Sequence, residues 1–201
     1  IARPYKIING KPSRISSLRR DFSVEPFKDT LLDDVLKNNG KVIGIGKIED
    51  IFVKKGISHA IHTGSNKEGL ELTLKALNNE LDLDKICITK SDYRNCDIEL
   101  IFTNLVDTDM LFGHRNDAKG YANALNEIDT YIPKILSSLK DDDLLIITGD
   151  HGCDPTVEGT DHTRENVPIV IYNKNKEPKD LGMIFGFDFV AKTIKNWLNI
   201  A

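Results

Sequence analysis

The side chains best suited to chemistry stand in the segment ITGDHGCDPTVEGTDHT, residues 147–163. It holds Asp150, His151 and His162, and carboxylate and imidazole groups are ligands of divalent cations such as Mn²⁺ and Mg²⁺. A carboxylate and a neutral imidazole are costly to bury without a partner, whereas a cation stabilises both of them. The segment therefore indicates a metal site.

A second group of the same side chains follows the apolar run IELIFTNLV, residues 98–106. Asp107 and Asp109 come directly after this run, and His114 follows a few residues later. The chain has five histidines, and three of them lie in these two segments beside aspartates. A single histidine is more often a surface or core residue than a ligand, but this recurrence favours a metal site. Asp109 and His114 are therefore candidate ligands as well.

Each ligand segment follows a run of residues that is typical of a buried strand. Residues 144–148 are apolar and partly β-branched, which fits a strand buried on both faces of a parallel sheet. Gly149 and Gly152 then allow the backbone to turn sharply. In open α/β sheets, ligands bind beyond the carboxyl ends of the strands. We therefore expect both ligand segments at one edge of a sheet.

Strand and helix patterns alternate along the chain. Strands are expected in the apolar start of the chain and at residues 42–48, 98–106, 143–148 and 167–172. Helices are expected at about residues 29–38, 68–79, 118–139 and 187–198. Residues 81–97 are ambiguous, and one interpretation places a short strand at 86–89. This alternation predicts an α/β fold with a mostly parallel sheet that helices cover on both faces.

The segment VIGIGK ends in Lys47, at the carboxyl end of a predicted strand. Its glycines match neither the dinucleotide-binding fingerprint nor the phosphate-binding loop of nucleoside triphosphatases, so close packing of a helix explains them better. Lys47 would lie at the same edge of the sheet as the metal ligands, where a lysine can contact a phosphate. It is therefore a candidate substrate-binding residue, and the alternative is a lysine with no such role.

Composition limits the class of protein. With 201 residues, 40% hydrophobic and 29% charged, the chain can form one main globular domain with a sizeable core. No apolar run approaches the roughly 20 residues that span a membrane, and no secretory signal is visible. Three cysteines without a zinc or disulfide spacing point to the cytoplasm. The net charge of -4 argues against nucleic acid as a partner.

The first 25 residues differ in charge from the rest. They carry six basic and two acidic side chains, so a local charge of +4 precedes a body of -8. The plain interpretation is a solvated arm, and the alternative is a phosphate grip, because the planar fork of arginine matches phosphate oxygens. The chain also begins at Ile1, inside what looks like a strand, so we do not expect this to be a natural beginning.

Four segments together resemble the phosphopentomutase family of the alkaline phosphatase superfamily. They are IARP near the start, GKIEDIF at 46–52, NLVDTDMLFGHR at 104–115 and GDHGCDPTVEGTDHTRENVPIVIY at 149–172. The resemblance runs through nearly the whole chain, and the DHG and GTDHTRE patterns are highly specific. It implies an enzyme of about twice this length, with an alkaline phosphatase-like core, a two-metal centre and an inserted cap domain.

Residues 1–25 would then be the end of the cap domain, and residues 26–201 the carboxyl-terminal part of the metal-binding core. The amino-terminal half of the same protein would be the missing partner of this chain. The family's nucleophilic threonine and a further metal-binding aspartate have no matching motif here, so no catalytic residue is nominated. We accordingly expect the chain alone to be inactive.

The resemblance also implies a set of metal ligands. By motif, Asp150 and His151 would bind one manganese ion, and Asp109, His114 and His162 a second one. Mg²⁺ or another divalent cation is the alternative to manganese. Carboxylate and imidazole ligands suit such ions better than metals that prefer thiolates. Two cations of this kind stabilise both the entering and the leaving oxygen of a phosphoryl transfer.

The reaction implied is the interconversion of ribose or deoxyribose 1-phosphate and 5-phosphate through a phosphorylated threonine, an isomerase reaction of nucleoside salvage in the cytoplasm. Arg14 would grip the distal phosphate of the pentose phosphate, although Ile15 and Ser16 differ from the Arg-Thr pair expected there. Alternatives on the same scaffold are a cofactor-independent phosphoglycerate mutase, a phosphatase or a sulfatase. A further alternative is a non-catalytic metal-binding fragment. Neither a nucleic acid nor a membrane is expected as a partner.

Overall fold

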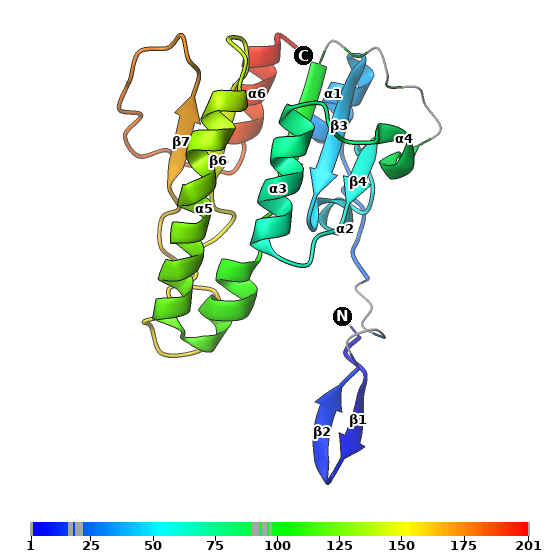
Figure 1. The fold of residues 1–201 in the computed structure, drawn as a ribbon, viewed down its shortest axis with the longest axis vertical. Coiled ribbons are helices and arrows are strands. Elements are labelled where there is room, and N and C mark those ends of the chain that lie inside the picture. Colours follow the sequence, from blue (N-terminus) through cyan, green and yellow to red (C-terminus); the bar gives the residue numbers. More distant parts are fainter. Residues whose placement is uncertain are drawn as a thin grey trace.

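A three-stranded parallel sheet forms one half of the fold. Its central strand β3 (Gly40–Ile45) pairs with β4 (His59–Ile61) on one side and with β5 (Ile98–Thr103) on the other (Figure 1). The predicted parallel α/β arrangement is thus confirmed in a smaller form. The structure is a computed structural model, and it describes residues 2–15, 18, 22–89, 93, 96 and 98–200.

Helices cover both faces of this sheet because apolar side chains alternate along β3. Val42 packs in a cluster formed by helices α1 and α2, whereas Ile43 and Ile45 pack with Ala76 of α3. A Cβ atom at Gly44 would lie 3.2 Å from the Ile48 side chain, so close helix packing explains this glycine. The bounds of these helices are α1 Leu31–Lys37, α2 Ile48–Ile51 and α3 Asn66–Leu77.

The other two strands form a separate antiparallel pair, β6 (Leu145–Thr148) and β7 (Ile169–Tyr172). No ladder joins this pair to the three-stranded sheet within the described part of the chain. The prediction of a strand buried on both faces of a parallel sheet is therefore wrong for β6, whose first two residues are half-buried and last two exposed. Parallel neighbours need a crossover connection, commonly a helix, and residues 149–168 contain none.

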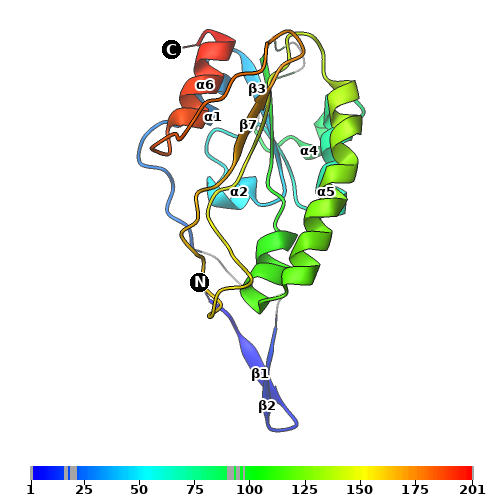
Figure 2. The ribbon, with the colours of Figure 1, turned by 90° about the vertical axis from the view of Figure 1, so that its left-hand side faces the viewer.

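The long helix α5 (Ala118–Ser138) links the two strand groups. Tyr131 and Ile135 of α5 pack against Leu70 of α3, and Leu145 of β6 lies against the same cluster. On the other side of the molecule, helix α6 (Phe189–Leu198) lies against α1 (Figure 2). The two groups of strands are therefore connected through packing on α5 and not through a β-ladder within the described residues.

An antiparallel hairpin of β1 (Tyr5–Ile8) and β2 (Lys11–Arg14) projects away from the helices (Figure 1). Its two-residue turn, Asn9-Gly10, has positive φ at both positions, as a tight hairpin requires. The expectation of a strand near the start of the chain is confirmed by β1. The assignment of residues 1–25 to a cap domain and 26–201 to the core stays a prediction.

Three short elements differ from expectation. Residues 83–86 form helix α4 (Leu83–Ile86), and Cys87 contributes only an isolated bridge to His59, so the strand expected at 86–89 is wrong. Strand β4 and helix α2 were not anticipated, because elements of three and four residues leave almost no periodicity to detect. No helix within the described residues is long and apolar enough to cross a membrane.

Candidate metal centre

A π-helix that begins five residues after the end of β5 positions the first candidate ligands. The chain leaves β5, turns into the π-helix η2 (Thr108–Phe112) and continues as the 3₁₀ helix η3 (Gly113–Arg115). Asp109 stands in η2 and His114 in η3, and Asp109 Oδ1 lies 3.2 Å from His114 Nε2. π-Helical turns are rare and occur frequently at functional sites. The local backbone thus brings the two side chains together.

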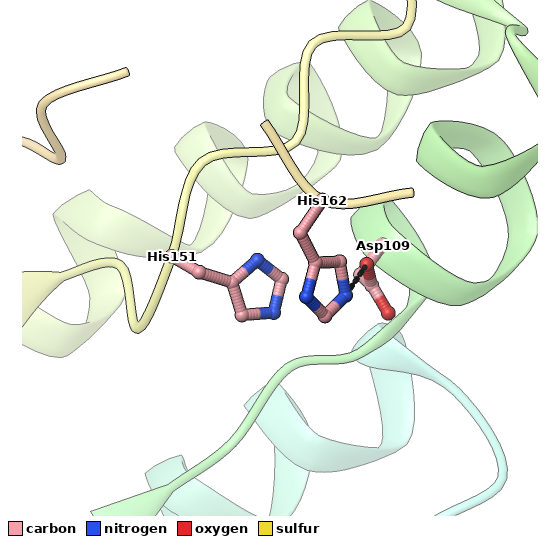
Figure 3. Close-up of side chains that lie close together, drawn as sticks. All are labelled: Asp109, His151 and His162. Atoms are coloured by element: carbon pink, nitrogen blue, oxygen red, sulfur yellow. Dashed lines mark ion pairs between the residues drawn. The ribbon is translucent and has the colours of Figure 1, made fainter. Parts of the chain in front are cut away.

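The segment after β6 supplies the other two histidines. An isolated bridge between Gly152 and Thr163 closes the loop, so that His151 and His162 come side by side. Their rings stack with centroids 3.6 Å apart, and His162 Nε2 lies 3.2 Å from Asp109 Oδ1 (Figure 3). Two ligand segments that are far apart in the sequence therefore meet at one point. The expectation that they share the edge of one sheet is wrong within the described residues, because β5 and β6 belong to separate sheets.

Two of the rings are held by backbone carbonyls. His114 Nδ1 lies 2.5 Å from the Thr160 carbonyl oxygen, and His151 Nδ1 lies 3.1 Å from the Gly152 carbonyl oxygen. Because a carbonyl oxygen can only accept, Nδ1 must carry the hydrogen in each case. In the neutral ring, Nε2 then carries the free lone pair. This is the usual arrangement of a metal-binding histidine.

The surroundings of Asp109 fit a cation. Its buried Oδ1 makes no hydrogen bond within the described residues, although two Nε2 atoms lie 3.2 Å from it. A divalent cation between Asp109 Oδ1 and these Nε2 atoms would make all of them ligands. Ligand atoms of Asp109, His151 and His162 all lie within 4.8 Å of one another. The donor set therefore fits a divalent cation.

The remaining predicted site residues lie outside this group. Asp150 is 71% exposed, and its Oδ1 is 3.7 Å from His151 Nε2. Lys47 is half-buried where β3 passes into α2, and it forms no ion pair or hydrogen bond with the group in the described structure. The backbone of Arg14 belongs to β2, but its side chain lies outside the described residues.

Cys153 lies beside the group and behaves as a packing residue. Burial raises the pKa of its thiol, and the charge of Asp109 raises that pKa further. The Sγ atom also fills the space next to Gly113. This contact favours Cys153 as a packing residue.

Sequence reasoning missed two parts of the site. The Thr160 carbonyl that orients His114 is a backbone group, which every residue has, so the residue type does not predict this contact. Asn66, the first residue of α3, exchanges hydrogen bonds with Asp107, and the pair is 41 positions apart in the chain. The only local signal was the helix start at Ser65, whose hydroxyl accepts from Glu68 N and caps α3.

Comparison with known proteins places this geometry in a family. The model of the metalloenzyme superfamily matches residues 39–201, which include both ligand segments. The chain belongs to the metalloenzyme superfamily. The match includes the three-stranded sheet and the β6–β7 pair.

Phosphopentomutases are among the relatives of this metalloenzyme domain. The chain is 46% identical to the phosphopentomutase of Acetivibrio thermocellus over 203 residues, which are 100% of this chain and 48% of the relative. It is 49% identical to the phosphopentomutase of Alkaliphilus metalliredigens and 45% identical to that of Caldanaerobacter subterraneus. Each of these two matches covers 100% of this chain and 47% of the relative. The chain thus spans about half the length of the curated relatives it matches.

Proposed function

We propose that this chain is the metal-binding part of a phosphopentomutase, an isomerase that interconverts ribose or deoxyribose 1-phosphate and 5-phosphate. The observation that carries the proposal is identity of 45–49% to phosphopentomutases over the full chain. The convergence of Asp109, His151 and His162 supports it independently, because phosphoryl transfer at a two-metal centre needs such ligands.

In this proposal, Asp150 and His151 bind one manganese ion, and Asp109, His114 and His162 bind the other. When bound, the two ions would polarise the phosphoryl oxygens and stabilise the entering and leaving oxygens. The chain's own contribution is to fix these ligands before the substrate arrives. The Thr160 carbonyl holds the His114 ring and the Gly152 carbonyl the His151 ring, so that Nε2 is the free donor in both.

Arg14 and Lys47 are the proposed contacts to the phosphates of the pentose. Lys47 suits this role because it follows β3, a strand whose carboxyl end lies at the same edge of the sheet as that of β5, which leads to Asp109. Arg14 suits it because a guanidinium can bind two phosphate oxygens at once. Both are proposed as substrate-binding residues rather than as catalytic ones.

We further propose that the nucleophilic threonine and one metal-binding aspartate belong to a part of the protein that this chain does not contain. The greater length of the phosphopentomutase relatives supports this. The structure supports it too, since β5 and β6 each have only one paired neighbour within the described residues. The proposed location of the whole enzyme is the cytoplasm.

The test is made on the full-length protein loaded with Mn²⁺. We expect conversion of ribose 1-phosphate into ribose 5-phosphate, and a higher melting temperature in the presence of ribose 5-phosphate than with 3-phosphoglycerate. Equal protection by 3-phosphoglycerate, together with no turnover of ribose 1-phosphate, would contradict the proposal. That result would favour a phosphoglycerate mutase on the same scaffold.

A further inference from the structure

Asn66 and Asp107 form a reciprocal, buried pair beside the metal centre. The backbone N–H of Asn66 donates to Asp107 Oδ2 at 2.7 Å, and the backbone N–H of Asp107 donates to Asn66 Oδ1 at 2.9 Å. Asn66 is 1% exposed and Asp107 is 7% exposed. Each side chain thus satisfies the backbone amide of the other residue, away from water.

The pair joins two elements that meet at the edge of the sheet. Asn66 is the first residue of α3, and Asp107 immediately precedes η2, which carries Asp109 two residues further on. Helix α3 is itself fixed, because Leu70 packs in the cluster formed with α5. The hydrogen bonds therefore transfer the rigidity of α3 to the segment that presents a metal ligand.

Among the residues that the structure describes, buried side-chain atoms without a hydrogen bond occur in this pair and in Asp109. Within the described residues, the buried side-chain atoms that lack a hydrogen bond are Asn66 Nδ2, Asp107 Oδ1 and Asp109 Oδ1. A buried carboxylate with a free oxygen is costly unless positive charge is near. A cation bound at Asp109 would supply that charge. Such a cation would therefore also stabilise the pair.

We propose that Asn66 and Asp107 are positioning residues of the metal centre, which hold Asp109 in the geometry that binds the cation. The proposal rests on the metal centre of the proposed function. Neither residue is a ligand in it. Substitution of such an outer partner of a metal site lowers metal affinity by roughly 10- to 100-fold.

The experiment measures the binding of Mn²⁺ to the chain by electron paramagnetic resonance, with the visible spectrum of bound Co²⁺ as a report on ligand geometry. Asn66→Ala removes one acceptor, and Asn66→Asp sets two carboxylates against each other. We expect each to weaken Mn²⁺ binding about tenfold or more and to change the Co²⁺ spectrum. The double swap Asn66→Asp with Asp107→Asn restores both acceptors and the charge, so we expect binding to recover to within about threefold of the original.

The matched control is Asn173→Ala. Asn173 is also buried, and its Nδ2 donates to the carbonyl oxygens of Asp141 and Asp143, so its loss should cost comparable stability. We expect this variant to bind Mn²⁺ as the unaltered chain does. The proposal is overturned if Asn173→Ala weakens binding as much as Asn66→Ala, or if the swap binds no better than Asn66→Asp.

Hydrogen exchange separates this inference from the proposed function. Without any metal, Asn66→Ala should speed amide exchange in residues 107–114 and leave exchange in β3 unchanged. Unchanged exchange in residues 107–114 would overturn the positioning role, whatever the metal data show. A failure of the unaltered chain to bind Mn²⁺ would overturn the link to the metal. Absence of mutase activity in the unaltered full-length protein, by contrast, would contradict the proposed function alone.

Discussion

Carbonyl oxygens, rather than charged groups, set the direction of the candidate ligands. The Thr160 and Gly152 carbonyls fix the Nδ1 side of His114 and His151, so each ring offers its Nε2 atom. This leaves Asp109 Oδ1 as a buried oxygen among ring nitrogens, with no hydrogen bond in the described structure. A fixed ring loses less conformational entropy on binding a cation, which is the energetic benefit of this arrangement.

Replacing Asp109 by Asn should show whether that oxygen is a ligand. Asp109→Asn keeps the size of the side chain and removes its charge, so we expect Mn²⁺ affinity of the chain to fall at least about tenfold in an equilibrium titration. The control is Asp161→Asn, an exposed aspartate beside His162. If both variants lose affinity equally, general negative charge rather than a defined site attracts the ion.

Buried His59 should make stability depend on pH. Burial lowers the pKa of this histidine, and the charge of Lys41 lowers it further, while Asp84 acts in the opposite direction. The unfolded chain therefore takes up the proton first. The stabilising contribution of neutral His59 is complete above the pKa of the unfolded chain, about 6.5. This contribution is lost as the pH falls from there through the pKa of the folded chain.

His59→Asn should flatten this dependence, because an amide can keep the contact with Ser58 Oγ, which lies 2.9 Å from His59 Nδ1, without titrating. Urea unfolding at pH 7.5 and at pH 5.5 measures the effect. We expect the free energy of unfolding to fall less between these two values in the variant than in the original. Other titrating groups are common to both proteins and cancel in the comparison, so equal losses would refute the role of His59.

Residue types in the sequence indicated the candidate ligands, but they did not indicate Asn66. Asp109, His114, His151 and His162 were recognisable because they recur after two apolar runs. Asn66 was not, because its partner is 41 positions away and the contact exists only once α3 lies beside β5. A contact between distant segments is a property of packing, and a single sequence does not show it.

At the scale of elements, the start of α1 shows how local chemistry fixes a boundary. Thr30 Oγ1 accepts from Leu32 N, and Asp33 Oδ2 accepts from Thr30 N at 2.7 Å, which together make a capping box. The helix is short, yet it contributes Leu32 and Val35 to the core. The sequence prediction of a helix from about residue 29 lies within two residues of the observed start, because the signal for this boundary is local.

Thr30→Ala should remove that cap. We expect a loss of about 1 kcal/mol in the free energy of unfolding, measured by urea denaturation, because the Leu32 amide loses its acceptor. Thr30→Ser keeps the hydroxyl oxygen and should lose much less. A serine variant as unstable as the alanine variant would show that the methyl group, and not the cap, is what matters.

Strand orientation was the element property that sequence could not give. The apolar run of β6 was located correctly, but its partner β7 runs antiparallel to it. A periodic pattern shows that a strand is buried or exposed, whereas orientation depends on the connection between strands and on which neighbours are available. In addition, β4 has only three residues, which is too few for a pattern.

At the scale of the whole molecule, β5 and β6 are edge strands within the described residues. Strand β3 is almost fully buried, whereas β5 and β6 are half-buried or exposed, and Phe102 and Ile147 remain 38% and 37% exposed. Each of β5 and β6 has one partner within the described residues, while α5 packs against elements of both groups. Further strands against these edges would bury the apolar side chains and satisfy the edge amides.

Joining this chain with the rest of a phosphopentomutase should therefore create activity that neither piece has. The reagent is the part of the Acetivibrio thermocellus phosphopentomutase that this chain does not match, produced together with the chain in the presence of Mn²⁺. We expect no conversion of ribose 1-phosphate by either piece alone, because the proposed nucleophile and the ligands described here are on different pieces. The mixture should convert it, and the amides of β5 and β6 should become protected from hydrogen exchange.

The same mixture made with the His162→Ala chain is the decisive control. His162 lies 3.2 Å from Asp109 Oδ1, so its removal should take away a ligand while the strands still pair. We therefore expect protection of β5 and β6 without turnover, which separates assembly of the sheet from chemistry at the site. Turnover by the unaltered chain alone would show that it carries a nucleophile of its own, and the division of the active site between two pieces would have to be abandoned.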